Sequence, residues 1–324
     1  MRIKVIGLAL GALLLALSFP ATAQQPTKIP RVGYLSISSP SLTSFRTEPF
    51  RQGLRDLGYV EGKNIVIEWR YAEGKLDRLH ELAAELVRLK VNIIVTSGPI
   101  PTQSIKEATV TIPIVMAFDS DPVGNGFVAS LARPGGNITG LSILAPEISG
   151  KRLELLKEVV PKLSRVAVLG NSSAPGNAQS LRETELAAGA LKVQLQILDV
   201  QGPKDIESAF RAAGKGRAGG VLVLNTPPFI EGKIPDVAVR NRLPAIYFNS
   251  QIVDGGGLMS YGASLADLDR RAATYVDKIL KGRTPDDLPV EQPMKFEFII
   301  NLKAAKQIGL TIPPNVLGAC RRKF

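Results

Sequence analysis

The sequence predicts an α/β protein of two lobes, each a mainly parallel sheet flanked by helices and connected by hinge crossings. Apolar runs of strand length alternate with amphipathic helical segments along the chain. This pattern is interrupted by a Gly-rich passage at residues 133–140 and starts again after residue 142 in the same βα order. A chain of 324 residues is long enough for two domains of ordinary size. We therefore expect two sheets and a hinge rather than one continuous sheet.

The first half contains four predicted strands and three predicted helices. The clearest strand is residues 65–71, where Ile65, Ile67, Trp69 and Tyr71 share one face. The predicted strands are residues 31–36, 65–71, 91–96 and 112–118, and the predicted helices are residues 42–57, 76–90 and 102–108.

The second half repeats this alternation and ends with elements that are expected to complete both lobes. Three prolines between Asn225 and Arg242 shorten the helix expected there. The predicted strands are residues 165–169, 194–199, 220–224, 244–248 and 296–300, and the predicted helices are residues 150–160, 178–190, 205–213, 265–281 and 303–308. The late helix and strand would return to opposite lobes, so the chain crosses between them several times.

Residues 1–23 are predicted to be a secretory signal peptide. Arg2 and Lys4 give a positive start, and residues 6–19 form an apolar core that is short for a membrane span. Ala21-Thr-Ala23 has the small-x-small pattern of a signal peptidase site, so we expect cleavage after Ala23. An uncleaved anchor is the alternative interpretation. No cysteine lies near this site, which argues against a lipid-anchored form.

Composition argues against several classes of protein. The net charge is +11, but basic residues are mixed with acidic ones, and the cluster Arg321–Lys323 lacks aromatic neighbours for stacking on bases. Nucleic-acid binding is therefore not expected. The single cysteine, Cys320, cannot form an internal disulfide, and the single histidine, His80, has no partner for a catalytic triad or zinc site. We predict no catalytic residue, no metal and no cofactor.

Five segments carry a resemblance to a known family. They are IPIVMAFDSDPVGNGFVASLARPGGNITGLS at residues 112–142, GLRDLGYVEGKNI from Gly53, LPAIY from Leu243, GGLMSYG from Gly256 and NLKAAKQIGLTIP from Asn301. In this order they resemble the ABC-transporter substrate-binding proteins, the family that includes tryptophan- and tyrosine-binding receptors. The resemblance covers residues 30–317.

The resemblance implies the type I periplasmic binding protein fold and a role in transport. It implies that residues 30–140 and 262–288 form lobe 1, and residues 141–261 and 289–324 form lobe 2. The protein would be a monomer in the periplasm that binds a small polar metabolite between the lobes and docks on ABC permease subunits in the inner membrane. By analogy with relatives, the first expected ligand is an amino acid, and aromatic amino acids are the first candidates. Another carboxylate-bearing metabolite is the alternative.

Two other functions are weighed against transport. A sensor subunit would bind the same ligand but dock on a membrane kinase, and the sequence does not separate this from transport. An exported α/β hydrolase would need a Gly-x-Ser-x-Gly elbow and a distant histidine, which are not present as a set. We therefore expect a binding protein that is not an enzyme.

Hydroxyl and amide side chains are concentrated at the ends of the predicted strands. Ligands of open α/β sheets bind beyond the carboxyl ends of the strands. Tyr261 lies in the passage that is expected to cross back between the lobes. The predicted ligand-binding residues are Ser36, Ser38, Ser97, Gly98, Pro99, Asp119, Ser120, Ser142, Asn171, Asn225, Tyr247, Asn249 and Tyr261.

Some of these positions have a structural alternative. The Ser97-Gly-Pro99 segment either directs helix N–H groups at a ligand carboxylate or simply starts a helix. Asp119 is a candidate partner for an ammonium group, or part of the turn that Asp121-Pro opens.

The aromatic side chains carry the same ambiguity. Phe229, Tyr247 and Tyr261 are candidates for an apolar wall of the site, or for core packing. Trp69 and Tyr71 share the apolar face of a strand and are expected in the core.

Overall fold

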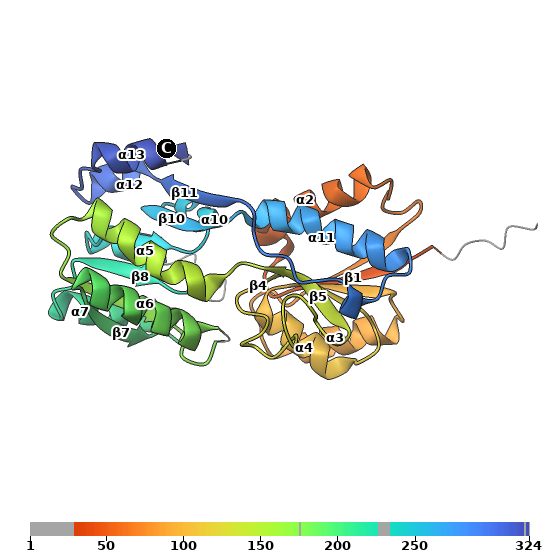
Figure 1. Ribbon diagram of the computed structural model, residues 1–324. Helices are drawn as coiled ribbons and strands as arrows, with labels where there is room; N and C mark the ends of the chain where they lie inside the picture. Colours follow the sequence, from red (N-terminus) through yellow and green to blue (C-terminus); the bar gives the residue numbers. More distant parts are fainter. Residues whose placement is uncertain (1–28, 175, 226–233, 321, 324) are drawn as a thin grey trace, which may run out of the picture.

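The computed structural model has two α/β lobes, each built on its own sheet (Figure 1). It describes residues 29–174, 176–225, 234–320 and 322–323. The predicted signal peptide and Phe229 lie outside the described residues. The predicted fold class, two mainly parallel sheets flanked by helices, is confirmed.

The first sheet has five parallel strands in the order β2-β1-β3-β4-β5. Their bounds are β1 Arg31–Ser36, β2 Val66–Tyr71, β3 Ile93–Ser97, β4 Ile114–Asp119 and β5 Ile138–Ser142. The fifth strand continues past residue 140, where the first lobe was expected to end. It pairs closely with β4, because a Cβ on Gly140 would lie 2.2 Å from the carbonyl oxygen of Met116. Glycine at this position therefore permits the pairing.

Helices cover both faces of the first sheet. They are α2 Pro40–Asp56 and α11 Leu265–Leu280 on one face, and α3 Arg78–Arg88 and α4 Pro99–Ala108 on the other. Tyr34 of β1 packs with Phe50 of α2, and its neighbour Leu35 packs on the opposite face with Leu86 of α3. Because both faces are buried, the inner strands β3 and β4 are nearly continuous apolar runs. Helix α11 returns to this lobe from a distant part of the sequence.

The second sheet has seven described strands in the order β12-β11-β10-β9-β8-β6-β7. Their bounds are β6 Arg165–Gly170, β7 Gln194–Asp199, β8 Gly220–Val223, β9 Ala245–Tyr247, β10 Met259–Ala263, β11 Phe296–Ile300 and β12 Arg322–Lys323. Among the described strand pairs, β10 with β11 is the antiparallel one. Strand β10 contains the Met-Ser-Tyr-Gly passage that was expected to cross back, so the crossing occurs only after Ala263.

The helices of the second lobe also form two layers. One layer contains α5 Ala145–Val159, α6 Asn177–Leu191, α12 Leu302–Gln307 and α13 Pro314–Ala319, and the other contains α7 Ile206–Lys215, α9 Ile234–Arg240 and α10 Ser250–Asp254. Short 3-10 turns lie at Pro203–Asp205 and Pro285–Asp287. No helix in the described ranges is long and apolar enough to cross a membrane.

The described chain passes between the lobes at three places (Figure 1). It leaves β5 for α5 after Ser142, leaves β10 for α11 after Ala263, and passes from residue 291 to β11. Leu141 and Glu291 form an isolated bridge, so two of these crossings lie side by side. Several neighbouring crossings of this kind allow a hinge motion without separation of the lobes.

Candidate functional site

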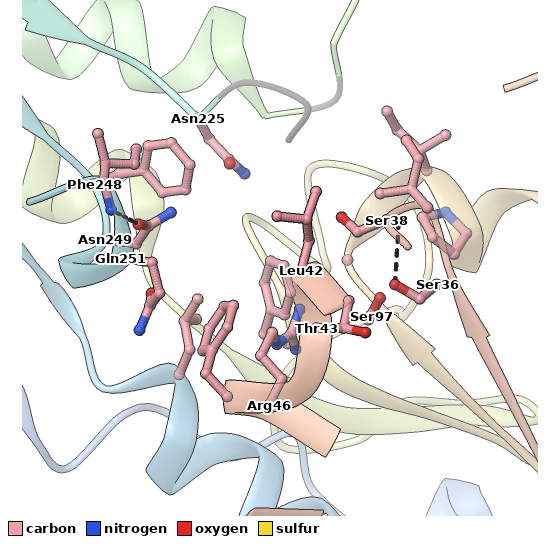
Figure 2. A pocket seen from close by; sticks show the side chains of 18 of the residues that line it. Ser36, Ser38, Leu42, Thr43, Arg46, Ser97, Asn225, Phe248, Asn249 and Gln251 are labelled. Carbon is pink, nitrogen blue, oxygen red and sulfur yellow. Dashed lines mark hydrogen bonds between the residues drawn. The ribbon is translucent and has the colours of Figure 1, made fainter. Parts of the chain in front are cut away.

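A cavity of about 340 Å³ lies between the lobes (Figure 2). One wall comes from the loops after β1, β3 and β4 and from the first turns of α2 and α4. The other comes from residues after β8 and β9 and from α10. This is the carboxyl edge of parallel strands, where α/β proteins bind ligands.

Four buried hydroxyl groups line the wall of the first lobe. Ser36, Ser38, Thr43 and Ser97 are only 1, 7, 3 and 5% exposed. The Ser38 N–H donates to Ser36 Oγ over 3.3 Å, and Thr43 Oγ1 donates to the Ser39 carbonyl over 3.0 Å. The side-chain hydroxyls of Ser38 and Ser97 form no hydrogen bond with any residue that the structure describes. They are therefore available to a ligand.

The helix that follows Ser97 begins earlier than the sequence predicted. Helix α4 starts at Pro99 rather than near residue 102, because the fixed φ of proline suits the first helical position. Gly98 precedes it with a φ of 112°, a conformation that favours glycine. The start of α4 therefore lies in the cavity wall together with Ser97.

The wall also contains a buried ion pair that the sequence analysis missed. Arg46 in α2 donates from Nε and Nη2 to the carboxylate of Asp269 in α11, over 2.8 and 2.9 Å. Its guanidinium lies over the Phe118 ring, 4.3 Å from the centroid. Arg46, Phe50 and Leu54 are four residues apart, so their side chains lie on the same face of α2. This face is buried.

The wall of the second lobe is formed by amides and apolar side chains. Asn225 follows β8, while Phe248 and Asn249 follow β9. Asn249 Oδ1 accepts the Ile252 N–H over 3.1 Å and so caps α10. Gln251 points from α10, and its buried Oε1 has no hydrogen-bond partner among the described residues. This oxygen can accept a hydrogen bond from a ligand.

Phenylalanines form most of the aromatic surface of the cavity. Phe45 comes from α2, Phe118 from the end of β4, and Phe248 from the residue after β9. These three were not predicted, and the aromatic candidates Tyr247 and Tyr261 are not in the wall. The other apolar wall residues are Ile37, Leu42, Pro99, Ile100, Pro101, Ala174, Pro235, Ile252 and Leu265.

The structure brings some of the predicted site residues together and separates others. The predicted residues that line the cavity are Ser36, Ser38, Ser97, Gly98, Pro99, Asn225 and Asn249. The predicted residues that lie outside its lining are Asp119, Ser120, Ser142, Asn171, Tyr247 and Tyr261.

Asp119 braces a loop instead of facing the cavity. Its fully buried carboxylate accepts the Asp121 N–H over 2.9 Å and the Asn125 amide over 2.8 Å. Burial raises the pKa of this carboxyl to about 7. The braced loop touches the other lobe, since a Cβ on Gly176 would lie 2.6 Å from Ser120 Oγ.

The other four residues outside the lining have local roles. Ser142 Oγ accepts the Leu144 N–H over 3.1 Å at the first crossing. Asn171 Oδ1 holds the turn after β6 by accepting the N–H two residues further on. Tyr247 is fully buried in the core of the second lobe, and burial raises the pKa of its hydroxyl. The ring of Tyr261 stacks on Phe296 at 5.9 Å.

Comparison with known proteins decides the family. The sequence profile of the ABC transporter substrate-binding proteins matches residues 34–323. The chain belongs to this family. Its members are non-enzymatic extracytoplasmic proteins, so the prediction that the chain is not an enzyme is confirmed. The chain is thus the substrate-binding component of an ABC transporter.

Individual relatives agree with this family. A tyrosine-binding protein of Clostridioides difficile is 28% identical over 280 residues, which are 85% of this chain and 79% of that relative. A conserved domain protein of Vibrio cholerae has a TM-score of 0.85 at 28% identity, with 92% of this chain and all of that chain covered. A Streptococcus pneumonia ABC domain in complex with L-Trp has a TM-score of 0.84 at 24% identity, covering 91% and 99%.

Acidic and metal-binding residues do not assemble into a metal site in the described part of the chain. Across these ranges, no three side chains of His, Cys, Asp or Glu are grouped as metal ligands would be. Apart from Arg46, the polar side chains of the described cavity wall are hydroxyls and amides. Such a wall suits hydrogen bonding to an organic ligand.

Proposed function

We propose that this substrate-binding protein works in the periplasm and closes its lobes on one small carboxylate-bearing molecule with an aromatic or other apolar body. The observation that carries the proposal is the pairing of two surfaces in one cavity. Buried hydroxyls with unused donors lie in the first lobe, and phenylalanine rings lie beside and across from them. Ligand pockets commonly combine an apolar lining with a few polar groups that orient the ligand.

The hydroxyl cluster suits a carboxylate. Ser38 and Ser97 each have an O–H group that donates to none of the described residues, and a hydrogen bond to a charged acceptor is stronger than one between neutral groups. Helix α4 begins in this wall, at Pro99, and the first turn of α2 contributes Leu42 and Thr43. The N-terminal ends of helices favour negative charge. The hydroxyl donors and the start of α4 therefore both favour an anion at this wall.

The apolar part of the cavity suits an aromatic ring or a branched chain. Phe45, Phe118 and Phe248 supply flat surfaces, and aromatic pairs are favourable beyond the area that they bury. The relatives named for tyrosine binding and solved with L-Trp support aromatic ligands. The aromatic amino acids are therefore the first members of this class to test, in line with the analogy to relatives.

Closure would couple ligand binding to transport. A ligand that contacts both walls stabilises the closed form over the open form by its differential affinity. The closed form would then be the one that docks, as a monomer, on the permease subunits of the importer. No nucleic acid is expected to bind.

The lobe boundaries and the location complete the proposal. We propose that residues 30–140 and 262–288 belong to lobe 1 and residues 141–261 and 289–324 to lobe 2, with each boundary moved to the nearby crossing, so that β5 stays whole in lobe 1 and β10 stays whole in lobe 2. The packing of α11 against α2 supports the second segment of lobe 1. The N-terminal signal sequence supports export and cleavage after Ala23.

A thermal-shift screen tests the proposal. Protein lacking residues 1–23 is heated with amino acids, organic acids, nucleobases and sugars. At a hundred times its dissociation constant, a ligand stabilises the fold by about 2.7 kcal/mol. We expect the hits to be aromatic or branched carboxylates. Hits confined to sugars or nucleobases would contradict the proposed ligand class.

A further inference from the structure

The charged groups of the cavity wall already balance each other. Within the described residues, Arg46 is the charged side chain of the wall. It forms two hydrogen bonds with the buried carboxylate of Asp269 behind the wall. The pair as a whole has no net charge, so the described part of the wall offers a ligand oriented dipoles and no net charge.

The first-lobe wall has a place for one negative group. Ser38 and Ser97 are more than nine-tenths buried, line the cavity and have no side-chain hydrogen bond with any described residue. Figure 2 shows Ser36, Ser38, Ser97 and Thr43 on the same side of the cavity. Hydroxyl donors can satisfy a carboxylate, whose oxygens only accept hydrogen bonds.

The second-lobe wall offers neutral acceptors and donors opposite this place. Gln251 presents a buried carbonyl oxygen without a partner in the described chain, and Asn225 lies in the same wall. An amide oxygen has two lone pairs that accept hydrogen bonds, but it has no charge with which to neutralise a cation. An ammonium group has three donors and a full positive charge, and its burial is strongly unfavourable without a paired anion.

One acidic residue next to the wall in sequence, Asp119, does not take that role. Asp119 follows Phe118, a wall residue, but lies outside the lining and is fully buried. Its Oδ1 is occupied by the Asp121 N–H and the Asn125 amide. Burial also raises its pKa to about 7, which lowers its negative charge near neutral pH.

We infer that the ligand is an aromatic or branched carboxylic acid without an α-ammonium group, with a remaining N–H or O–H group that donates to Gln251. This inference rests on the proposed function and narrows its ligand class. It separates this chain from the two relatives whose names record tyrosine and L-Trp. The carboxylate binds at Ser38 and Ser97, and the ring or branched chain packs between the phenylalanines.

Matched ligand pairs that differ only by the ammonium group test the inference. Two pairs have the required O–H or N–H donor on the ring: 3-(4-hydroxyphenyl)propanoate with tyrosine, and 3-(indol-3-yl)propanoate with tryptophan. The pair of 3-phenylpropanoate and phenylalanine lacks this donor and shows what the donor contributes. Each is titrated by calorimetry into protein lacking residues 1–23. We expect the acid of at least one pair to bind ten times more tightly than its amino acid.

The outcomes separate this inference from the proposed function. If at least one compound binds but no acid exceeds its amino acid tenfold in affinity, the inference is wrong and the proposed function stands. If none of the six compounds, and no branched acid such as 3-methylbutanoate, binds, both are wrong.

A single substitution provides a second test. Gln251→Glu places a carboxylate in the second-lobe wall and should shift the affinity ratio at least tenfold toward the amino acid of a pair. Gln307→Glu makes the same change on the exposed surface of α12 and should leave the ratio unchanged. An unchanged ratio in a folded Gln251→Glu protein would overturn the position assigned to the ligand.

Discussion

Arg46 of α2 and Asp269 of α11 are 223 residues apart in sequence and form a buried ion pair that joins the two helices. Its two hydrogen bonds fix the guanidinium beside the cavity and over the Phe118 ring. The Tyr34 hydroxyl lies 3.5 Å from the same carboxylate. The pair thus connects the packing of α2 and α11 to the shape of the ligand wall.

Breaking this pair should be costly. Arg46→Leu leaves the Asp269 carboxylate buried without its partner, and we expect the free energy of unfolding to fall by about 3–5 kcal/mol. Urea unfolding measures it. The double variant Arg46→Leu with Asp269→Leu removes both charges and should be more stable than Arg46→Leu alone. A single variant as stable as the wild type would show that the pair contributes little.

Gly140 should tolerate no side chain. Its φ of 137° opposes a Cβ, and so does the Met116 carbonyl oxygen, which lies 2.2 Å from the position that a Cβ would take. We expect Gly140→Ala to destabilise the protein by at least about 1–3 kcal/mol, seen as a lower melting temperature. Gly136→Ala, where a Cβ would meet nothing within 4 Å, is the control and should be near neutral. Equal melting temperatures for the two variants would contradict the close pairing of β4 with β5.

Stability should fall as the pH rises from 4 to 7. Burial raises the pKa of Asp119 from 3.8 to about 7, so the folded chain holds a proton here that the unfolded chain has lost. Unfolding then releases a proton, and the contribution of this group weakens by at most about 1.4 kcal/mol per pH unit in that window. Asp119→Asn should flatten this dependence in chemical unfolding measured from pH 4 to 8. Parallel profiles for the two proteins would assign the effect to other groups.

The sequence predicts the sheets well, for a physical reason. Strands buried on both faces must be continuously apolar, so residues 93–97 and 114–119 stand out. Strand β5 was missed because Gly140 and its polar neighbours look like a bend, although glycine is needed there for close strand pairing. Strand β10 was missed for a similar reason, as its Ser260-Tyr-Gly262 stretch is short and partly polar.

Only part of the candidate site can be predicted in this way. Residues that follow strands, such as Ser36, Ser97 and Asn249, line the cavity because parallel strands end at one edge. The same rule also selects Asn171, whose side chain instead holds its own turn. This rule does not select wall residues on helices, such as Phe45. Their position depends on how the helices pack and on how the two lobes face each other.

The most direct test of the central claim is calorimetric titration of the Ser97→Leu protein with the tightest ligand found for the wild type. Ser97 Oγ faces the cavity and bonds to no described residue, so leucine should fill the carboxylate position and leave the fold nearly as stable. Ser44→Leu, at an exposed position of α2 outside the cavity, is the control. We predict at least a hundredfold loss of affinity for Ser97→Leu and none for Ser44→Leu. Wild-type affinity in a folded Ser97→Leu protein would contradict the claim that the ligand binds between the lobes at the hydroxyl cluster.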